Sequence, residues 1–427
     1  MKKTMILVIL LAMVLSIVGC SSSKPAAPAA VDNKEVKIGI VLPLTGSSAE
    51  MGKLSKNGIE LAINTINANG GIKSLGGAKL VPIYADSAGK PETGVTEIER
   101  LIVKDKVNAL LGPYNSNVAA PTAEVAEKYS MPYMLTNAVA DDILKKGYKY
   151  VWRANQSSSG NAIDLIGFLS DLGKKTGKPV KTIALVYEST DWGTSSAEAL
   201  KKTAKEAGIE VVAAMDYPAN TADMTSIVVK LKSLNPEVVI PMSYLNDALL
   251  FTRTVAEMKL NSAILAGGGG FSAPAFVEKA GKSADYVMTL SGWDPDILGS
   301  KSEASKKLNA DYKAKYGSDF SEYSANAWMS AMVLFDAIER AGSLKPEAIK
   351  TALDATDIKG DQVALSLHPY EGIKFSQEVR GMKSQNTYAR QVIVQVQNGK
   401  FRMVWPFNTA PKDVQISWPV PAWTERK

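Results

Sequence analysis

Cysteine and histidine occur once each in these 427 residues, as Cys20 and His368. A lone cysteine closes no disulfide within the chain, so the folded part depends on a hydrophobic core. The stretch "SLHPY" around His368 offers no second histidine, and neither HExxH nor GxSxG occurs. We therefore interpret His368 as a solvated or capping residue and expect no catalytic residue, no metal and no cofactor.

Blocks of one charge and long apolar runs are also scarce. The formal net charge is +6, and the basic residues are spread along the chain, so we expect no nucleic-acid partner. The exception is the apolar run Met5 to Val18, which follows Lys2 and Lys3. It is shorter than the roughly 20 residues of a membrane span, and with its charged head it is typical of an export signal. A short anchor or a buried helix is the alternative.

The run ends in Ile17-Val18-Gly19-Cys20, which resembles the lipobox of bacterial lipoproteins. The resemblance implies cleavage before Cys20 and lipid on its sulfur. Residues 1–19 are then a signal peptide, and residues 20–34, rich in Ser, Ala and Pro, are a lipid anchor and flexible tether. We expect export and anchoring to the outer face of the cell membrane, or a periplasmic position where an outer membrane is present. The lipid is the only membrane contact that we expect.

From residue 36 onward, apolar β-branched runs alternate with helical patterns. The stretch "VKIGIVLPLTG" (36–46) predicts a buried strand, and "KLSKNGIELAINTINANGGI" (53–72) predicts a helix that ends at Gly70-Gly71. Such alternation favours parallel sheets covered by helices on both faces. The pattern restarts near residue 148, and Asn398-Gly399 marks a late hairpin. We predict an α/β fold with two doubly wound, Rossmann-like lobes.

The loops that follow the predicted strands have a shared composition. Ligands of such folds bind beyond the carboxyl ends of the strands. The loops are rich in Ser, Asn, Gly, Tyr and Trp, which suit a site for a small solute. They are "LTGSSAEMG", "GPYNSN", "LTNAVA", "YESTDWG", "MSYLND", "AGGGGFS" and "SGWDPD".

Three stretches resemble one family closely: "KIGIVLPLTGSSAEMGKLSKNGIELAINTINANGGI", "LLGPYNSNVAAPTAEVAEKYSMPYMLTNA" and "YSANAWMSAMVLFDAIERAG". Over about residues 36–397 the chain is similar to the branched-chain amino acid-binding (Leu/Ile/Val-binding) family of ABC-transporter substrate-binding proteins. The resemblance implies the type I periplasmic-binding-protein fold, in which two lobes joined by three crossovers close on a ligand. Lobe 1 is then 36–155 plus 290–385, and lobe 2 is 156–289 plus 386–427.

The same resemblance implies the partners of the protein. It implies a small-molecule ligand, delivery of that ligand to an ABC-transporter permease, and a monomer. A ligand-sensing receptor domain for a signalling protein stays open as the alternative. The sequence offers no site chemistry for an enzyme.

The resemblance also assigns ligand-binding residues. In "GPYNSN" it assigns the ligand's carboxylate to Ser116, with Tyr114 and Asn115 beside it, although plain helix capping is the simpler explanation of such a turn. The further positions are Asn137, Ala138, Val139, Trp192, Tyr244 and Trp293. Aromatic residues taken singly are as often part of a core.

One stretch departs from the family. Its amino-acid-binding members hold the ligand's ammonium with an acid at the end of a second-lobe strand, where this chain has "LAGGGGF" (265–271). Asp191, Asp247 and Asp294 lie on loops of the same side and are candidate replacements, each also typical of turns and caps. We therefore predict that the ligand is not a leucine-like zwitterion. A carboxylate, an amide or an aromatic acid fits at least as well as an amino acid. We also expect the glycines to leave space for a ligand that is bulkier than the family's usual ones.

Overall fold

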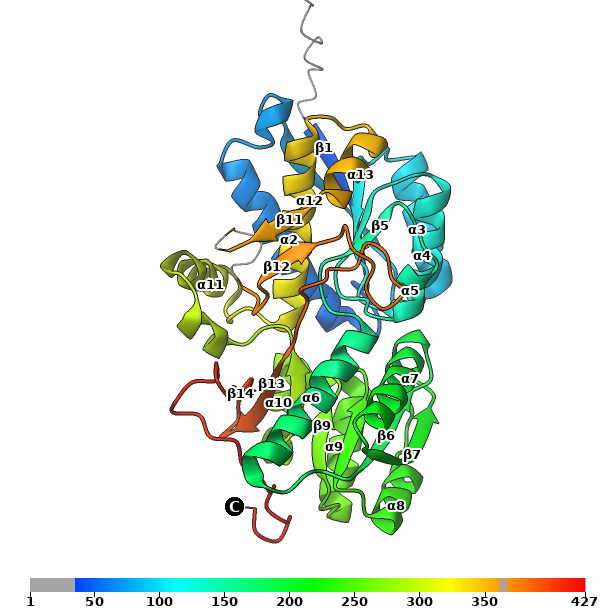
Figure 1. Cartoon of the computed structure of the whole chain (residues 1–427). Coiled ribbons are helices and arrows are strands. Elements are labelled where there is room, and N and C mark those ends of the chain that lie inside the picture. Colours follow the sequence, from blue (N-terminus) through cyan, green and yellow to red (C-terminus); the bar gives the residue numbers. More distant parts are fainter. Residues whose placement is uncertain (1–34, 361, 363–366, 427) are drawn as a thin grey trace, which may run out of the picture.

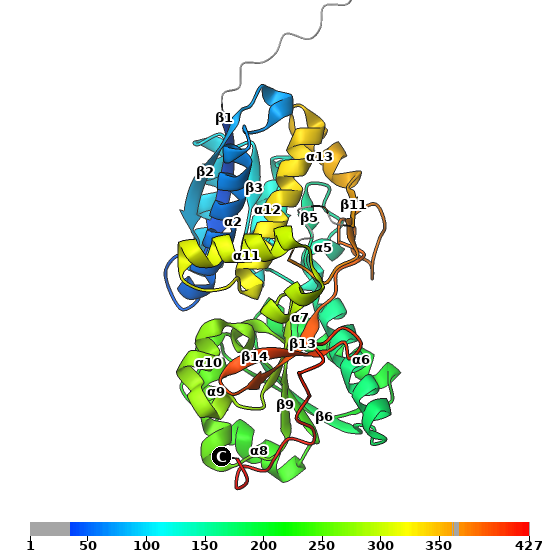
Figure 2. The same cartoon turned by 90° about the vertical axis from the view of Figure 1, so that its left-hand side faces the viewer.

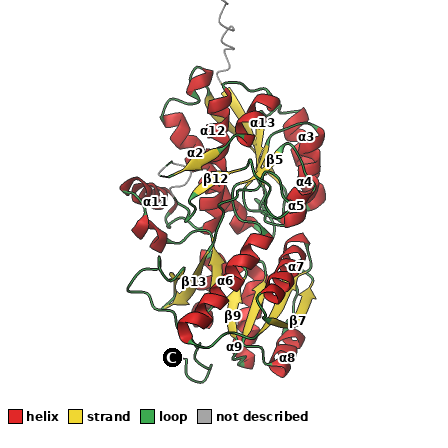
Figure 3. Cartoon of the chain, viewed as in Figure 1, coloured by secondary structure: helices red, strands yellow, loops and turns green. Residues whose placement is uncertain are grey.

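The computed structural model describes residues 35–360, 362 and 367–426. The predicted signal peptide, the tether and Cys20 lie outside these ranges. Two α/β halves lie one above the other in Figure 1, the upper in blue, cyan and yellow to orange and the lower in green and red. Figure 3 shows strands flanked by helices in both halves, which confirms the predicted fold class. No helix within the described ranges is long and apolar enough to cross a membrane.

The upper half is built on a parallel sheet of order β2-β1-β3-β4-β5. Its strands are β1 (Glu35–Leu42), β2 (Lys79–Asp86), β3 (Ala109–Leu111), β4 (Tyr133–Leu135) and β5 (Val151–Arg153). Successive residues of a strand point to opposite faces. Ile40 accordingly packs under the helices of one face and Val41 under those of the other.

The lower half is built on a mixed sheet of order β14-β13-β10-β9-β8-β6-β7. Its strands are β6 (Thr182–Glu188), β7 (Glu210–Tyr217), β8 (Val238–Met242), β9 (Ala263–Ala266), β10 (Met288–Ser291), β13 (Val392–Gln397) and β14 (Lys400–Trp405). The predicted hairpin is confirmed: β13 and β14 pair antiparallel, and Asn398 and Gly399 both have positive φ. A short pair, β11 (Asp357–Lys359) and β12 (Gly372–Lys374), accompanies the upper half.

The helices cover both faces of each large sheet. They are α2 (Ala49–Ala68), α3 (Pro91–Val103), α4 (Ser116–Lys128), α5 (Asp141–Lys145), α6 (Ser158–Thr176), α7 (Asp191–Glu206), α8 (Thr225–Leu234), α9 (Leu245–Met258), α10 (Pro274–Ala280), α11 (Glu303–Tyr316), α12 (Glu322–Ala341) and α13 (Pro346–Asp354), with 3-10 turns η1 (Lys73–Leu75), η2 (Gly269–Ser272), η3 (Gly281–Ala284) and η4 (Pro295–Ser300). In the upper half, α2, α12 and α13 share a core on one face, and α3, α4 and α5 share a core on the other.

Within the described residues, the chain passes between the halves three times. It leaves the upper half after β5, returns after β10 and leaves again after Gln385, which bridges to Arg153. The helix α12 therefore belongs with the upper half although the preceding strands lie in the lower one. Figure 2 shows α12 beside α2 in front of the upper sheet. Each half thus consists of chain segments that are far apart in sequence.

The close packing of α2 on α12 depends on Gly58. A Cβ at this position would lie 2.1 Å from the carbonyl oxygen of Ser324. Gly167 on α6 is a helical glycine without this constraint, because the nearest atom to its Cβ position, on Trp405, is 4.0 Å away.

This contrast gives a prediction. We expect Gly58→Ala to lower the free energy of unfolding by about 1–3 kcal/mol, since the two helices must move apart. We expect Gly167→Ala to leave it unchanged or to raise it by about 0.5–1 kcal/mol, because alanine is the better helix former. Urea denaturation midpoints measure both, and equal midpoints for the two variants would contradict this account.

His368 belongs to a buried series of hydrogen bonds that includes Asn326 of α12. Its Nε2 lies 2.9 Å from Asn326 Oδ1, and Asn326 in turn donates to Asn137 Oδ1 at 3.2 Å. The interpretation of a solvated or capping histidine is wrong, because the side chain is fully buried against Tyr370. Burial, helped by the charge of Lys301, lowers the pKa of His368 to about 3. Within the described residues, no group of three or more His, Cys, Asp or Glu side chains is arranged for a metal ion.

The buried imidazole predicts a pH dependence of stability. Unfolded histidine binds a proton below about pH 6.5, whereas the folded protein does so only near pH 3. Stability is therefore fully present above pH 6.5 and falls as the pH decreases, by about 2 kcal/mol at pH 5. Buried acids with raised pKa, such as Asp164 (about 6), act in the opposite sense.

The comparison of wild type with His368→Gln at pH 7 and pH 5 isolates this contribution. We expect the loss of stability on acidification to be about 2 kcal/mol smaller in the variant. Because the chain has one histidine, its imidazole resonances are also directly assignable. Titration of the imidazole near pH 6.5 in the folded protein would overturn the prediction.

Candidate ligand-binding site

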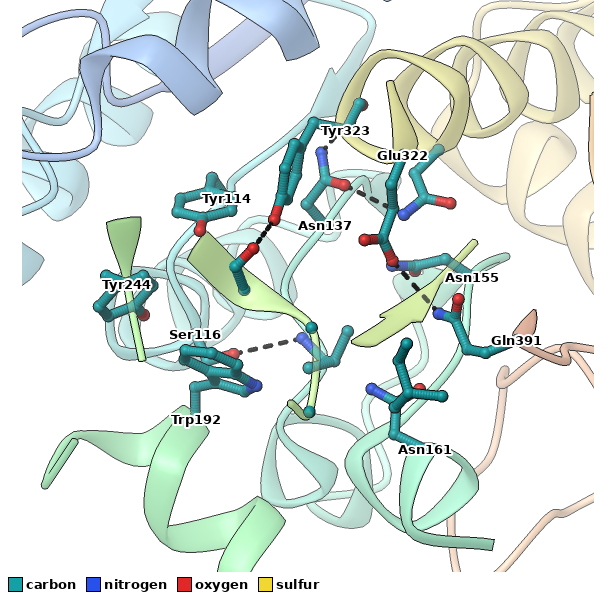
Figure 4. Close-up of a pocket in the computed structure, with 16 residues that line it drawn as sticks. Tyr114, Ser116, Asn137, Asn155, Asn161, Trp192, Tyr244, Glu322, Tyr323 and Gln391 are labelled. Carbon is teal, nitrogen blue, oxygen red and sulfur yellow. Dashed lines mark hydrogen bonds between the residues drawn. The ribbon is translucent and has the colours of Figure 1, made fainter. Parts of the chain in front are cut away.

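A cavity of about 50 Å³ lies between the two halves, at the carboxyl ends of strands from both sheets. Figure 4 shows the side chains around it. The upper half contributes the turns after β3, β4 and β5 and the start of α12. The lower half contributes the turns after β6, β8 and β9, together with α6, β10 and the residue before β13. The lining residues are Tyr114, Ser116, Asn137, Val139, Asn155, Asn161, Trp192, Tyr244, Gly267, Gly268, Gly269, Leu290, Glu322, Tyr323, Asn326 and Gln391.

Ser116 is the first residue of α4, and its hydroxyl faces the cavity. The hydroxyl oxygen accepts hydrogen bonds from the main-chain N–H groups of Val139 and Ala140, both at 3.2 Å. A hydroxyl whose oxygen accepts twice still has its proton to donate. The positive end of α4 adds to the attraction for a negative group. This end of the cavity is therefore suited to a carboxylate.

Plain helix capping was the simpler explanation of this turn, and Asn115 is the residue at the N-cap of α4. Its side chain makes no capping hydrogen bond to α4. Its Nδ2 instead donates to Ser48 Oγ at 3.2 Å, away from the cavity lining. Of the two neighbouring polar residues Asn115 and Ser116, Ser116 is thus the one that lines the cavity.

Four aromatic rings form one wall of the cavity, with Ser116 beside Trp192 (Figure 4). Tyr114 lies 5.5 Å from Tyr323 and 5.7 Å from Tyr244, and Trp192 lies 5.0 Å from Tyr244, measured between ring centroids. Their tilted and edge-on contacts are typical of packed aromatic groups. Figure 4 shows these rings together on one side of the cavity. They supply a flat apolar surface for a ligand.

Two glycines of the run do not provide the expected free space. A Cβ at Gly269 would lie 2.1 Å from Trp192 Cη2, and one at Gly267 would lie 2.9 Å from Met242 Cγ. The expectation of extra room is therefore wrong at Gly267 and Gly269, where Met242 and the Trp192 ring fill the space. At Gly268 the nearest atom to a Cβ position is the Leu290 carbonyl oxygen at 3.9 Å, but its φ of +83° disfavours any side chain.

The remaining wall is polar and includes the acid Glu322. Glu322 Oε2 accepts a hydrogen bond from Ser272 Oγ at 2.6 Å, and Gln391 Nε2 donates to Oε1 at 3.4 Å. Burial raises the pKa of Glu322, although these hydrogen bonds oppose the shift. The side-chain oxygens of Asn155, Asn161 and Gln391 are buried without a hydrogen-bond partner among the described residues.

Six of the ten predicted site residues line the cavity: Tyr114, Ser116, Asn137, Val139, Trp192 and Tyr244. Their contact with a ligand stays a prediction. Asn115, Ala138, Trp293 and Asp294 are buried nearby but are not part of the lining. Trp293 packs against Phe320, with 6.0 Å between ring centroids.

The three candidate aspartates lie outside the cavity lining as well. Asp294 caps η4 by accepting the N–H of Asp296 at 2.9 Å, and burial raises its pKa to about 7. Asp247 accepts the N–H of Asn220 at 3.0 Å. Asp191 is the first residue of α7, where a carboxylate complements the helix dipole. Asp294 thus has the cap role that was the simpler explanation, whereas Asp247 holds the distant loop at Asn220 and Asp191 lies in the first turn of α7.

Sequence reasoning missed the polar wall. Asn155 and Asn161 flank the first crossover, Gln391 follows the third, and Glu322 begins α12. The stretch "FSEYSANAW" contained a usable signal, since an acid and a tyrosine directly follow the capping residue Ser321. No local pattern indicated that these distant segments meet.

The chain is similar to known proteins over most of its length. A family model described as periplasmic binding protein matches residues 35–400. Leu/Ile/Val-binding protein homolog 8 of Brucella suis is 34% identical over 401 residues, which cover 92% of this chain and 95% of that protein.

Two solved structures share the fold. The branched-chain amino acid transporter substrate-binding protein LivJ from Streptococcus pneumoniae, in complex with isoleucine, has a TM-score of 0.73 at 22% identity and covers 86% of this chain and 97% of its own. A solute-binding protein of an ABC transporter from R. palustris, in complex with benzoate, has a TM-score of 0.70 at 20% identity. The match covers 87% of this chain and 95% of that protein. Together with the family match, these likenesses show that the chain belongs to the branched-chain amino acid-binding family of type I periplasmic binding proteins.

Proposed function

We propose that this protein is the solute-binding lipoprotein of an ABC importer, and that it captures a small carboxylate between its two halves for delivery to a permease. The observation that carries the proposal is the Ser116 hydroxyl, which keeps its proton for a ligand at the N-terminus of α4. The solved structures that share the fold hold isoleucine and benzoate, and both ligands are carboxylates.

Closure on the ligand is supported by hydrogen bonds across the cavity. Tyr323 on α12 donates to the carbonyl of Gly269 in η2, and Ser272 of η2 donates to Glu322. These contacts join the upper half to the lower half beside the crossovers, where a hinge motion would break them. We place the lobes at 36–155 plus 292–385 and at 156–291 plus 386–427. The predicted boundary at 289/290 moves to 291/292, because the whole of β10 (Met288–Ser291) pairs with β9 and β13 of the second lobe.

Ser116→Ala tests the carboxylate site. Loss of one hydrogen bond to a charged group, worth about 1.5–3 kcal/mol, should weaken binding roughly tenfold to a hundredfold. Leucine, isoleucine, valine and benzoate are first screened for thermal stabilisation, because a ligand stabilises the state that it binds. Calorimetry then measures the dissociation constant of the best carboxylate.

Ser170→Ala is the matched control, since Ser170 Oγ donates to the Ile166 carbonyl on α6, outside the cavity lining. We expect the control to bind as the wild type does. Equal affinity of Ser116→Ala and wild type for the same carboxylate would remove the observation on which the proposal rests.

Cys20→Ala tests the lipid anchor. We expect the variant to leave the membrane fraction and to appear in the medium or the periplasm, because the remaining signal has no thiol to acylate. Ser21→Ala, which keeps Cys20, should remain with the membrane. Fractionation and immunoblotting measure the distribution, and membrane retention of Cys20→Ala would contradict the anchor.

A further inference from the structure

The polar wall of the cavity has hydrogen-bond acceptors that lack donors. Asn155 is 1% exposed and Gln391 is 5% exposed, yet the side-chain oxygen of each has no partner in the described part of the chain. Asn161 presents a third such oxygen. Buried acceptors without donors cost free energy, so this wall is complementary to a ligand group with several N–H donors.

Glu322 gives this wall its charge. It is the acidic residue among the lining side chains, and no lysine, arginine or histidine lines the cavity. Its partners in the described residues are Ser272, Gln391 and the main chain of Gly292, and all of these are neutral. A buried carboxylate without a cation is costly, and a ligand that brings a cation offsets that cost.

The ligand's own carboxylate adds a second requirement. A carboxylate bound at Ser116 shares a small cavity with Glu322, so two negative charges face each other at low dielectric. A positive group on the same ligand relieves this repulsion. Figure 4 shows Glu322 and Gln391 on the side of the cavity away from Trp192 and Tyr244, which leaves the aromatic rings for the apolar part of the ligand.

We infer that Glu322, with the amide oxygens of Gln391, Asn155 and Asn161, forms a subsite for the ammonium group of an amino-carboxylate ligand. The acid comes from the start of α12, whereas the glycine turn carries no acid and the Trp192 ring fills the place beside Gly269. The inference rests on the proposed function, since it concerns the same cavity. It replaces the sequence-based prediction of a non-zwitterionic ligand, whose reason was the missing acid at residues 267–270.

The hydrogen bond from Ser272 offers a competing explanation, in which Glu322 only joins the two halves. Matched ligand pairs separate the two roles. Leucine and 4-methylpentanoate share one carbon skeleton, as do phenylalanine and 3-phenylpropanoate, and the second member of each pair lacks the ammonium. Loss of an ammonium contact weakens binding only of the member that carries the ammonium, whereas weaker closure of the two halves weakens binding of both members.

The experiment measures the dissociation constants of the four compounds for wild type, Glu322→Gln, Ser272→Ala and Asp294→Asn. We expect wild type to prefer the amino member of at least one pair tenfold or more, and Glu322→Gln to lose most of that preference. Ser272→Ala should weaken both members equally. Asp294→Asn, which neutralises a buried acid outside the lining, should leave the preference unchanged.

Three results would overturn the inference. Equal binding of both members by wild type, or tighter binding of the members without nitrogen, rejects the ammonium subsite and leaves the proposed capture of carboxylates standing. A preference that persists in Glu322→Gln, with melting temperature and circular dichroism unchanged, assigns the ammonium contact elsewhere. Failure of wild type to bind any of the four compounds or benzoate rejects the proposed function, and the subsite with it.

Discussion

The helix α12 packs along α2 in the upper half, and its first turn hydrogen-bonds to η2 in the lower half. One helix therefore joins the two halves beside the cavity and supplies part of its lining. Gly58 allows the backbones of α2 and α12 to approach closely, and this approach fixes where Glu322 and Tyr323 meet the other half. A helix displaced by the width of a methyl group would carry the polar wall and part of the aromatic wall with it.

The closed cavity combines a packed aromatic side with a polar side whose hydrogen bonds are incomplete. Packed rings cost nothing when the cavity is empty, whereas buried oxygens without donors and an unpaired carboxylate do. Under the proposed function, this cost favours an open form when no ligand is bound, because water can then reach these groups. A ligand that supplies the missing donors favours closure, which is the coupling that a solute receptor requires.

The sequence predicted the features that depend on local pattern. Alternating strands and helices, the hairpin at Asn398-Gly399 and the turn with Ser116 each follow from neighbouring residues. The polar wall was not predictable, because Glu322 and Gln391 reach the cavity only through crossovers that join segments far apart in the chain. The volume beside Gly269 was misjudged for a related reason: the ring that fills it comes from a different strand-end loop.

The position of α12 also constrains the order in which the protein becomes compact. Its buried face, with Trp328 and Phe335, covers one side of a sheet whose strands all precede residue 154. A nascent or newly exported chain that ends before α12 leaves that side of the first sheet only partly covered, by α2, even though all five strands are present. The first half to emerge is thus the later one to be completed, and its exposed apolar surface has to be shielded until the rest of the chain has arrived.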